Sequence, residues 1–349
     1  MPAFTSRLIA WQRRQGRHHL PWQNIRDAYR IWLSEIMLQQ TQVTTVIGYY
    51  ERFVQSFPTV QALAAAPLAR VLEHWSGLGY YRRAHHLYAA AQSIVNNYSG
   101  VFPDTQEKLM TLPGIGRSTA AAIAVFAFGQ RAAILDGNVR RLLARHHGIE
   151  GFTGLPTVEK TLWALAEQLL PKQHLEAYTQ GLMDLGAQIC TRSKPRCAQC
   201  PLRFDCAAYH QNRVHELPTP RFGKTPVRRD FCLLILRRNG RVLLEARADR
   251  GIWSGLWSFP ECNADDGLAA LIQTRWRLTL TAKTALPVLV HKLTHRTLHI
   301  TPILATVRGC LHNTTALEAR FLSLPEARQC ALPAPVRRLL EQEKRFFET

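Results

Sequence analysis

A glycine-containing turn followed directly by an alanine-rich segment constrains this chain more than any other stretch. The turn reads Leu-Pro-Gly-Ile-Gly over 112–116, and residues 118–128 continue as an apolar, alanine-rich helix pattern. Gly114 and Gly116 let the backbone turn sharply and expose consecutive N–H groups at a helix N-terminus, an arrangement suited to a phosphate. Asp136 follows in a second tight turn. The stretch therefore predicts that the chain holds a DNA backbone and places a carboxylate near it.

Length and charge are consistent with two basic, globular domains. The 349 residues are enough for two domains, each with its own hydrophobic core. A content of 46% hydrophobic and 20% charged residues is typical of globular chains. The 44 basic and 25 acidic side chains give a formal net charge of +19, which favours a polyanionic partner through phosphate neutralisation. A basic enzyme without a nucleic-acid partner fits the charge about equally well, so charge alone leaves the partner open.

The sequence predicts a cytoplasmic protein. Arg13, Arg14 and Arg17 lie where a signal peptide would need a long apolar run. No stretch approaches the roughly 20 apolar residues of a membrane span, so we expect no membrane partner. Inside the cell thiols stay reduced, and clustered cysteines there bind metal more often than they form disulfides.

Hydrophobic spacing predicts a helical first part and a mixed second part. Helices are expected over 36–47, 81–97 and 118–128. Residues 207–229 are rich in proline and arginine and predict a basic linker. Beyond the linker, strands are expected over 231–236, 242–245 and 298–307, a hairpin turn at 238–240, and helices over 267–276 and 335–346. This second part is typical of an α+β domain.

Four of the eight cysteines lie close together in the sequence, at Cys190, Cys197, Cys200 and Cys206. Four thiolates from one loop can hold zinc or an iron–sulfur cluster. Structural zinc sites usually show two short cysteine pairs, whereas only Cys197 and Cys200 are closely paired here, so the wider arms fit a bulkier cluster. The residues by themselves leave both metals open.

Together the hairpin, the Asp136 turn and the cysteine loop resemble the helix–hairpin–helix DNA glycosylases related to endonuclease III. Residues 32–42 (Trp-Leu-Ser-Glu-Ile-Met-Leu-Gln-Gln-Thr-Gln), 77–81 (Gly-Leu-Gly-Tyr-Tyr) and 183–186 (Met-Asp-Leu-Gly) narrow the resemblance to the adenine DNA glycosylases of the MutY type. The basic linker and a second domain in the position of that family's MutT-like domain extend the resemblance over nearly the whole chain.

The resemblance implies a multi-domain fold. An all-α helix–hairpin–helix glycosylase domain is expected over 1–206, with the helix–hairpin–helix at about 110–128 and an iron–sulfur loop at 190–206. An α+β MutT-like (Nudix-fold) domain is expected over 230–349, after the linker at 207–229. Only the opening of the Nudix signature is present in that domain, at Gly255 and Glu261. We therefore expect this domain to read DNA and not to hydrolyse nucleotides.

The function implied is hydrolysis of the N-glycosidic bond of adenine mispaired with 8-oxoguanine or guanine in double-stranded DNA. The product is an abasic site, left without efficient strand cleavage by a monomer that carries a 4Fe–4S cluster on the four cysteines. In this mechanism Glu35 is a general acid toward adenine N7, and Asp136 stabilises the oxocarbenium-like sugar. Desolvation by its apolar neighbours is expected to raise the pKa of Glu35. Protein partners and the preference between the two mispairs stay undetermined.

The resemblance also implies the residues that contact DNA. Gln40 enters the base stack, Tyr80 wedges beside the opposing base, and Trp22 walls the adenine pocket. Gly114, Gly116 and Ser118 contact DNA at the hairpin. Ser118 stands where strand-cleaving relatives carry a lysine that forms a Schiff base with the sugar. A serine hydroxyl cannot do this, so base removal alone is predicted.

Recognition of 8-oxoguanine is implied for Thr294 and His295. In the family a Phe-Ser-His loop performs this role, and the corresponding residues here are Leu293, Thr294 and His295. The hydroxyl and the imidazole are retained, but Leu293 cannot stack as a phenylalanine does. The effect of that change on lesion affinity is left open.

Each implied role has a simpler alternative. Glu35 can lie on a solvated helix face, and Asp136 can be an ordinary helix cap. For the whole chain, the enzymatic alternative is an endonuclease III-like glycosylase and lyase for oxidised pyrimidines. The non-enzymatic alternative is a helix–hairpin–helix protein that only binds DNA.

Overall fold

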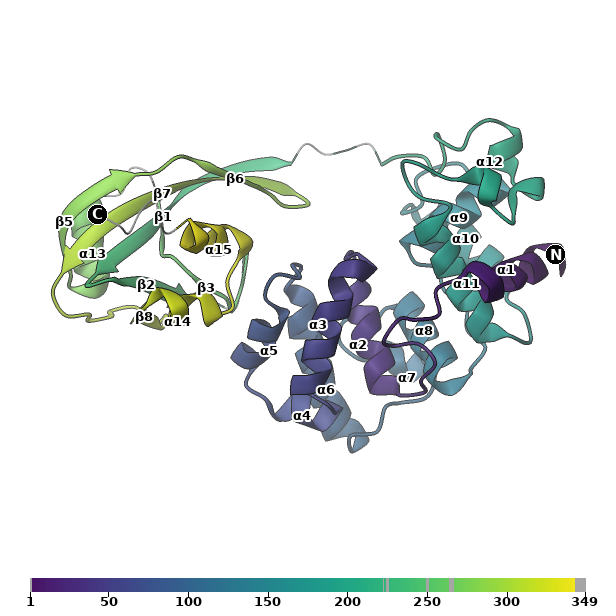
Figure 1. The fold of residues 1–349 in the computed structure, drawn as a ribbon, viewed down its shortest axis with the longest axis horizontal. Helices are drawn as coiled ribbons and strands as arrows, with labels where there is room; N and C mark the ends of the chain where they lie inside the picture. Colours follow the sequence, from purple (N-terminus) through teal and green to yellow (C-terminus); the bar gives the residue numbers. More distant parts are fainter. Residues whose placement is uncertain (1, 222, 224–225, 249–250, 264–266, 343–349) are drawn as a thin grey trace. The chain divides into compact units, whose positions relative to one another are not determined.

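The computed structural model describes residues 2–221, 223, 226–248, 251–263 and 267–342, and it divides into two units (Figure 1). The first unit comprises Met1–Ala65 and His85–Phe222, and the second comprises Ala66–Ala84 and Gly223–Thr349. The first unit is helical, whereas the second combines a sheet with helices. The predicted fold class, an all-α domain followed by an α+β domain, is confirmed.

The first unit is built from helices joined by short connections. Its longer helices are α1 (Pro2–Gln15), α2 (Ala28–Leu38), α3 (Val43–Ser56), α6 (Arg82–Tyr98), α8 (Arg117–Phe128), α9 (Gly137–His147), α10 (Pro156–Leu169) and α11 (Leu175–Gln188). Its shorter elements are α4 (Val60–Ala65), α7 (Gln106–Met110), η1 (Cys197–Gln199), η2 (Arg203–Asp205) and α12 (Ala207–His210). The chain passes from the second unit into the first within the first turn of α6.

Helices α2 and α8 form the centre of this unit. Small side chains over Ala120–Ala124 bury most of α8, and α2 packs directly against it. Trp32, Leu33 and Met37 of α2 are fully buried. Both helices are apolar on more than one face, as expected of helices surrounded by others. They give the candidate site residues at their ends a rigid support.

The single helix expected over 36–47 is wrong. Helix α2 ends at Leu38 and α3 begins at Val43, so two helices replace one. Between them Gln40 has a φ of 58°, in the left-handed region that ends a right-handed helix. The apolar spacing continues across this turn because both helices face the same core, and the turn is therefore hidden in the sequence pattern.

The second unit is centred on an eight-stranded mixed sheet with the main strand order β3-β2-β1-β7-β5. Its strands are β1 (Val227–Arg238), β2 (Arg241–Ala246), β3 (Trp257–Ser258), β4 (Glu261–Cys262), β5 (Thr279–Ala285), β6 (Leu289–Lys292), β7 (Arg296–Arg308) and β8 (Ala319–Leu322). The long strands β1 and β7 pair in parallel, and the other pairs are antiparallel. The predicted hairpin joins β1 to β2 through Asn239 and Gly240, which both have positive φ.

Helices α5 (Leu68–Trp75), α13 (Leu268–Trp276), α14 (Leu324–Gln329) and α15 (Ala334–Glu341) complete the second unit. Helix α13 packs against β5, and α14 packs against β2 and β8. The core between α13 and the sheet contains Leu234, Leu236 and Trp276, all fully buried. The helix predicted over 335–346 corresponds to α15, and residues 343–346 lie outside the described residues.

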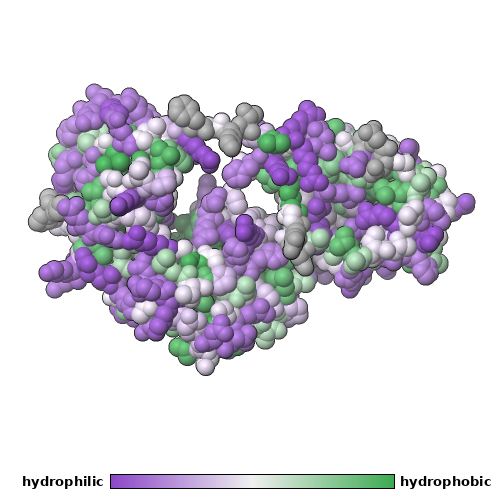
Figure 2. Space-filling view, turned by 180° about the vertical axis from the view of Figure 1, so that it is seen from behind, coloured by the Kyte–Doolittle hydropathy of each residue, from purple (hydrophilic) through white to green (hydrophobic). Residues whose placement is uncertain are grey.

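The segment expected to be a linker, 207–229, contains α12 and the start of β1. Its residues 222, 224 and 225 lie outside the described residues. On the face of the molecule shown in Figure 2, hydrophilic residues predominate and hydrophobic residues form small, separate patches. Among the described residues, no helix is long and apolar enough to cross a membrane.

Candidate active site and cysteine cluster

Glu35 lies near the end of α2 and lines a cavity of about 480 Å³ in the first unit. Asp27 begins this helix as an N-cap and accepts a hydrogen bond from the Arg30 amide. Trp22, which is also buried, and Leu38 contribute apolar walls to the same cavity. The cavity therefore places the carboxyl group of Glu35 in the same space as an aromatic wall, and Glu176 also lines it.

The environment of Glu35 favours its protonated form. Burial raises the pKa of Glu35 from its usual 4.5 to about 8, and the nearby negative charge of Asp136 adds to this rise. At pH 7 the side chain therefore carries a proton. A neutral carboxylic acid facing a cavity is suited to donate that proton to a bound base.

Asp136 is the N-cap of α9. Its Oδ1 accepts hydrogen bonds from the amides of Asn138 at 2.9 Å and Val139 at 2.8 Å. Burial raises the pKa of Asp136, and these two amide donors oppose the rise, together with Arg141 and Arg140. The capping alternative is thus present in the structure. It does not exclude chemistry, because both hydrogen bonds go to Oδ1 and Oδ2 remains available.

The structure contains a buried polar network at the cavity wall that the sequence did not predict. Asp184 is fully buried, and it accepts hydrogen bonds from the Arg17 amide at 2.8 Å, from Arg17 Nε at 2.5 Å and from Gln180 Nε2 at 2.8 Å. Arg17 and Gln180 both line the cavity. Asp184 lies in the Met-Asp-Leu-Gly segment that supports the family resemblance. Its place in that segment was the sequence signal that could have identified it.

The two hairpin glycines have different structural roles. Gly114 has a φ of 77°, and a Cβ there would lie 2.7 Å from the Cβ of His86. Gly116 is the N-cap of α8 with an ordinary φ, and a Cβ there would meet nothing within 4 Å. The turn itself thus requires Gly114, whereas Gly116 leaves open space beside the unpaired amides of the first helical turn.

Ser118 connects the hairpin to the Asp136 turn. Its Oγ accepts a hydrogen bond from the Leu135 amide at 3.0 Å, one residue before Asp136. The hydroxyl is therefore engaged within the protein. Gln40, in contrast, is exposed in the left-handed turn directly after α2, the helix that carries Glu35. Such backbone conformations recur at functional sites.

Tyr80 and Thr294 come together in the second unit although they are 214 positions apart in the sequence. The Tyr80 side chain is 47% exposed and its φ is 47°. Its hydroxyl lies 3.4 Å from Thr294 Oγ1. Thr294 and His295 are exposed in the turn between β6 and β7, and the His295 carbonyl accepts a hydrogen bond from the Val227 amide.

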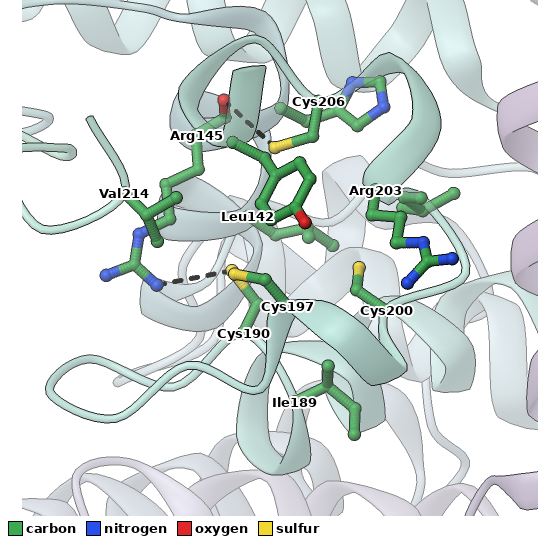
Figure 3. Close-up of a pocket in the computed structure, with 12 residues that line it drawn as sticks. Leu142, Arg145, Ile189, Cys190, Cys197, Cys200, Arg203, Cys206 and Val214 are labelled. Carbon is green, nitrogen blue, oxygen red and sulfur yellow. Dashed lines mark hydrogen bonds between the residues drawn. The ribbon is translucent and has the colours of Figure 1, made fainter. Parts of the chain in front are cut away.

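The four clustered cysteines line one cavity, into which their side chains project (Figure 3). Arg145 is buried beside them and donates to Cys190 Sγ at 3.4 Å. Its other hydrogen bonds go to the carbonyl oxygens of Leu217, Thr191 and Arg192. A buried guanidinium with neutral partners favours an anionic group next to it.

The cysteine side chains bear on the two metal groups considered from the sequence. Within the described ranges, no three His, Cys, Asp or Glu residues are placed to hold a single metal ion. Four sulfur atoms around a shared cavity are nevertheless the ligands of an iron–sulfur cluster, which is larger than one ion. The four cysteines therefore match the ligand set of such a cluster.

Two carboxylates of the second unit, those of Glu245 and Glu261, are paired with arginines. Glu245 Oε1 and Oε2 accept from Arg275 at 2.8 and 2.6 Å. Glu261 pairs with Arg247 at 2.8 Å and with Arg229 at 3.0 Å. Each of these two carboxylates is thus paired with guanidinium groups.

Comparisons with known protein families match both parts of the chain. Residues 33–168 match the HhH-GPD superfamily of base excision DNA repair proteins, and residues 231–342 match the NUDIX domain. An adenine DNA glycosylase of Buchnera aphidicola subsp. Baizongia pistaciae is 36% identical over 344 residues, which cover 98% of this chain and 97% of the relative. The adenine DNA glycosylase of Homo sapiens is 35% identical over 312 residues, covering 74% of this chain and 57% of the relative.

Solved structures resemble the helical part. A thermostable thymine-DNA glycosylase has a TM-score of 0.55 and 31% identity, covering 60% of this chain and 95% of that chain. Endonuclease III in a non-covalent DNA complex has a TM-score of 0.51 and 21% identity, covering 58% and 92%. The second similarity shows the shared fold only.

Proposed function

The chain belongs to the adenine DNA glycosylase family, and we propose that it removes adenine mispaired with 8-oxoguanine or with guanine and leaves an abasic site. It is a DNA glycosylase of base excision repair, and DNA is its substrate. The observation that carries the proposed chemistry is Glu35: a carboxyl group with a pKa of about 8 that faces a cavity and lies near the second carboxyl group, Asp136.

The proposed reaction divides the work between these two carboxyl groups. Adenine is a poor leaving group unless it is protonated, and protonated Glu35 donates a proton to adenine N7. The bond between N9 and C1′ then breaks, and adenine takes the bonding electron pair. Asp136, as a carboxylate, stabilises the positive charge on the sugar. Water adds to C1′, and the proton that it releases restores the protonated state of Glu35.

Adenine must leave the duplex to reach Glu35, because the bond to be broken is inaccessible within the base stack. The cavity of about 480 Å³ has room for a purine between Trp22 and Glu35. Gln40 is exposed directly after α2, and we assign it to fill the space that the base vacates. Tyr80 and Thr294 are assigned to the opposing base, with His295 beside them.

The residue at position 118 supports base removal without strand cleavage. Ser118 replaces the lysine of the strand-cleaving relatives, and its hydroxyl is bonded to the Leu135 amide. The hairpin glycines and the start of α8 are assigned to the DNA backbone, where free amides at a helix N-terminus bind phosphate. The enzyme thus binds the DNA backbone at the hairpin and supplies no nucleophile there.

The four cysteines, Cys190, Cys197, Cys200 and Cys206, are assigned to hold a 4Fe–4S cluster. When bound, this group supplies a structural crosslink to a loop that otherwise has only short η1 and η2 turns. Arg145 balances its negative charge from the buried side. Iron and sulfide analysis after anaerobic purification checks the assignment, and a colourless protein with stoichiometric zinc would contradict it.

A duplex panel tests the reaction. Duplexes with A:8-oxoguanine, A:guanine, A:cytosine or thymine glycol:A are incubated with the protein and analysed with and without alkali. We expect breaks at adenine opposite 8-oxoguanine and guanine only after alkali. Breaks at thymine glycol without alkali would establish the endonuclease III-like alternative, and binding without any base release would establish the non-catalytic one.

A further inference from the structure

The loop that carries Tyr80 is attached at both of its ends to one residue near the C-terminal end of the second unit. At one end, Ser76 Oγ accepts hydrogen bonds from the Leu332 amide at 3.2 Å and from Arg337 Nη2 at 2.9 Å. At the other end, the Tyr81 hydroxyl donates to the Leu332 carbonyl at 3.1 Å. We call these four residues, Ser76, Tyr81, Leu332 and Arg337, the latch.

The latch satisfies buried backbone groups. Leu332 is fully buried, so its amide and carbonyl need partners within the protein. The Ser76 hydroxyl pairs with the amide and also lies 3.4 Å from the carbonyl, which Tyr81 shares. Removal of the Ser76 hydroxyl would leave the Leu332 amide without its partner. The latch is therefore a specific connection and not a loose surface contact.

The backbone between the two anchors is strained and braced. Gly77, Gly79 and Tyr80 have φ values of 103°, 73° and 47°. The Gly79 carbonyl accepts hydrogen bonds from Trp75 Nε1 at 3.2 Å and from Arg83 Nη2 at 3.1 Å. A non-glycine residue in the left-handed region persists where its surroundings hold it there. The braces and the latch together supply that constraint for Tyr80.

Tyr80 reaches Thr294 from this constrained loop. The two hydroxyl groups are 3.4 Å apart. Ordering two exposed side chains on separate segments costs conformational entropy when a ligand binds. In this chain that cost is met during folding, because the latch fixes the Tyr80 loop to the unit that contains the Thr294 turn.

We propose that the latch preorganises Tyr80 and Thr294 as one reading surface and thereby determines the preference for 8-oxoguanine over guanine opposite the target adenine. This role rests on the proposed function. Ser76 and Arg337 act here as positioning residues, since they touch the loop and not the base. Loss of either side chain leaves Glu35 and its cavity unchanged, so adenine excision from A:guanine duplexes continues. The ratio of the excision rate on A:8-oxoguanine to that on A:guanine falls.

Charge alone offers another explanation for an effect of Arg337, and α15 contains a matched control. Arg338 is the next residue on the same helix and is exposed, whereas Arg337 is half-buried against Ser76. R337Q and R338Q remove the same positive charge from nearly the same place. A long-range effect on DNA binding would appear in both variants, whereas an effect through the latch appears in R337Q only.

The test compares single-turnover excision rates on A:8-oxoguanine and A:guanine duplexes for the full chain, S76A, S76T, R337Q and R338Q. We expect S76A and R337Q to lower the rate ratio by about fivefold each, the loss that corresponds to one hydrogen bond. We expect the A:guanine rate to change by less than about twofold. S76T keeps the hydroxyl and R338Q leaves the latch intact, so both should retain the wild-type ratio.

A double variant adds a second measurement. If the latch acts through Thr294, S76A and T294A lower the ratio together by less than the product of their separate effects. Thermal unfolding of each variant separates selectivity from global stability, and R337Q continues the test if S76A does not fold.

Three results would overturn the proposal. S76A and R337Q could keep the wild-type ratio, or they could slow both substrates equally, which is the signature of a merely structural contact. Either result refutes the proposed role of the latch but leaves the proposed function intact, provided that the unaltered chain prefers A:8-oxoguanine. An unaltered chain with equal rates on both duplexes would instead refute the lesion preference itself, and the latch would fall with it.

Discussion

Acidic residues in the two units of this molecule have opposite electrostatic surroundings. In the first unit, burial and the negative charge of Asp136 raise the pKa of Glu35 to about 8. In the second unit, burial also raises the pKa of Glu245, but Arg275 opposes it with two hydrogen bonds. Glu261 has two arginine partners. Burial is therefore accompanied by a protonated carboxyl group in one region and by ion pairs in the other.

The difference shows that a partly enclosed carboxyl group behaves according to the charges around it. A buried carboxyl group without a cation retains its proton and can act as an acid, at a cost in stability. A buried carboxylate paired with guanidinium supports the fold, and it has no proton to donate. Changing one partner at a time in each region tests this contrast.

The largest effect is expected for E35Q, which keeps the shape of the side chain but has no acidic proton. At pH 7 the single-turnover rate of adenine excision should fall by about 10²- to 10⁴-fold, the usual contribution of general acid catalysis. DNA affinity, measured by fluorescence anisotropy, should persist. E51Q is the matched control because Glu51 is exposed on the neighbouring helix α3. Simultaneous loss of binding and excision in E35Q would assign Glu35 a structural role.

The same variant should be more stable than the unaltered chain. Unfolded Glu35 loses its proton near pH 4.5, whereas the folded state holds it to about pH 8, so the folded state binds more protons between these values. The stability of the unaltered chain therefore falls as pH rises through this window. E35Q lacks this term, and at pH 7 its free energy of unfolding should be higher by up to about 3 kcal/mol. Urea denaturation at pH 5 and pH 7 measures the gap, and a gap that shrinks with rising pH would contradict the assigned pKa.

E245Q tests the ion-paired region. The substitution leaves Arg275 partly buried without its carboxylate, which should lower the free energy of unfolding by about 2 kcal/mol. The excision rate should stay within about twofold of the unaltered value, since Glu245 lies in the other unit from Glu35. E318Q is the control, because Glu318 forms an exposed pair with Arg320. A large rate loss in E245Q at normal stability would show that this carboxylate takes part in the reaction.

R229Q should have the smallest effect. Arg229 is one of two arginines on Glu261 and its side chain is 39% exposed, so Arg247 still neutralises the carboxylate after the change. A loss of about 0.5 kcal/mol is expected from the same denaturation measurement. A loss as large as that of E245Q would mean that the two arginines are not redundant.

Much of the helical fold was predictable because its signals are local. Prolines and glycines separate the helices, and residues 118–128 show their burial in their own composition. The turn at Gln40 was not predictable, since the apolar spacing continues across it. Glu35 and Asp136 were identified from residues and resemblance. The pKa of Glu35 depends on how other segments enclose it, and this enclosure is a property of packing.

The site residues illustrate the same limit. Asp184 belongs to a recognised segment, but its bonds to Arg17 cross 167 positions of the chain. Ser76 and Leu332 are 256 positions apart, and no periodicity or motif relates them. Contacts at such separations depend on which faces meet, and several arrangements of the same helices and strands satisfy the same local pattern.

By itself the sequence indicated the family and the two kinds of domain. It also supplied Glu35 and Asp136 as candidate site residues and the four clustered cysteines as candidate ligands, because residue identity and local spacing encode them. Only the tertiary structure decided which carboxyl groups are left without a cation and which are neutralised. It alone placed Tyr80 beside Thr294. The physical reason is that desolvation and charge pairing depend on distances in space, which are set when segments far apart in the chain pack together.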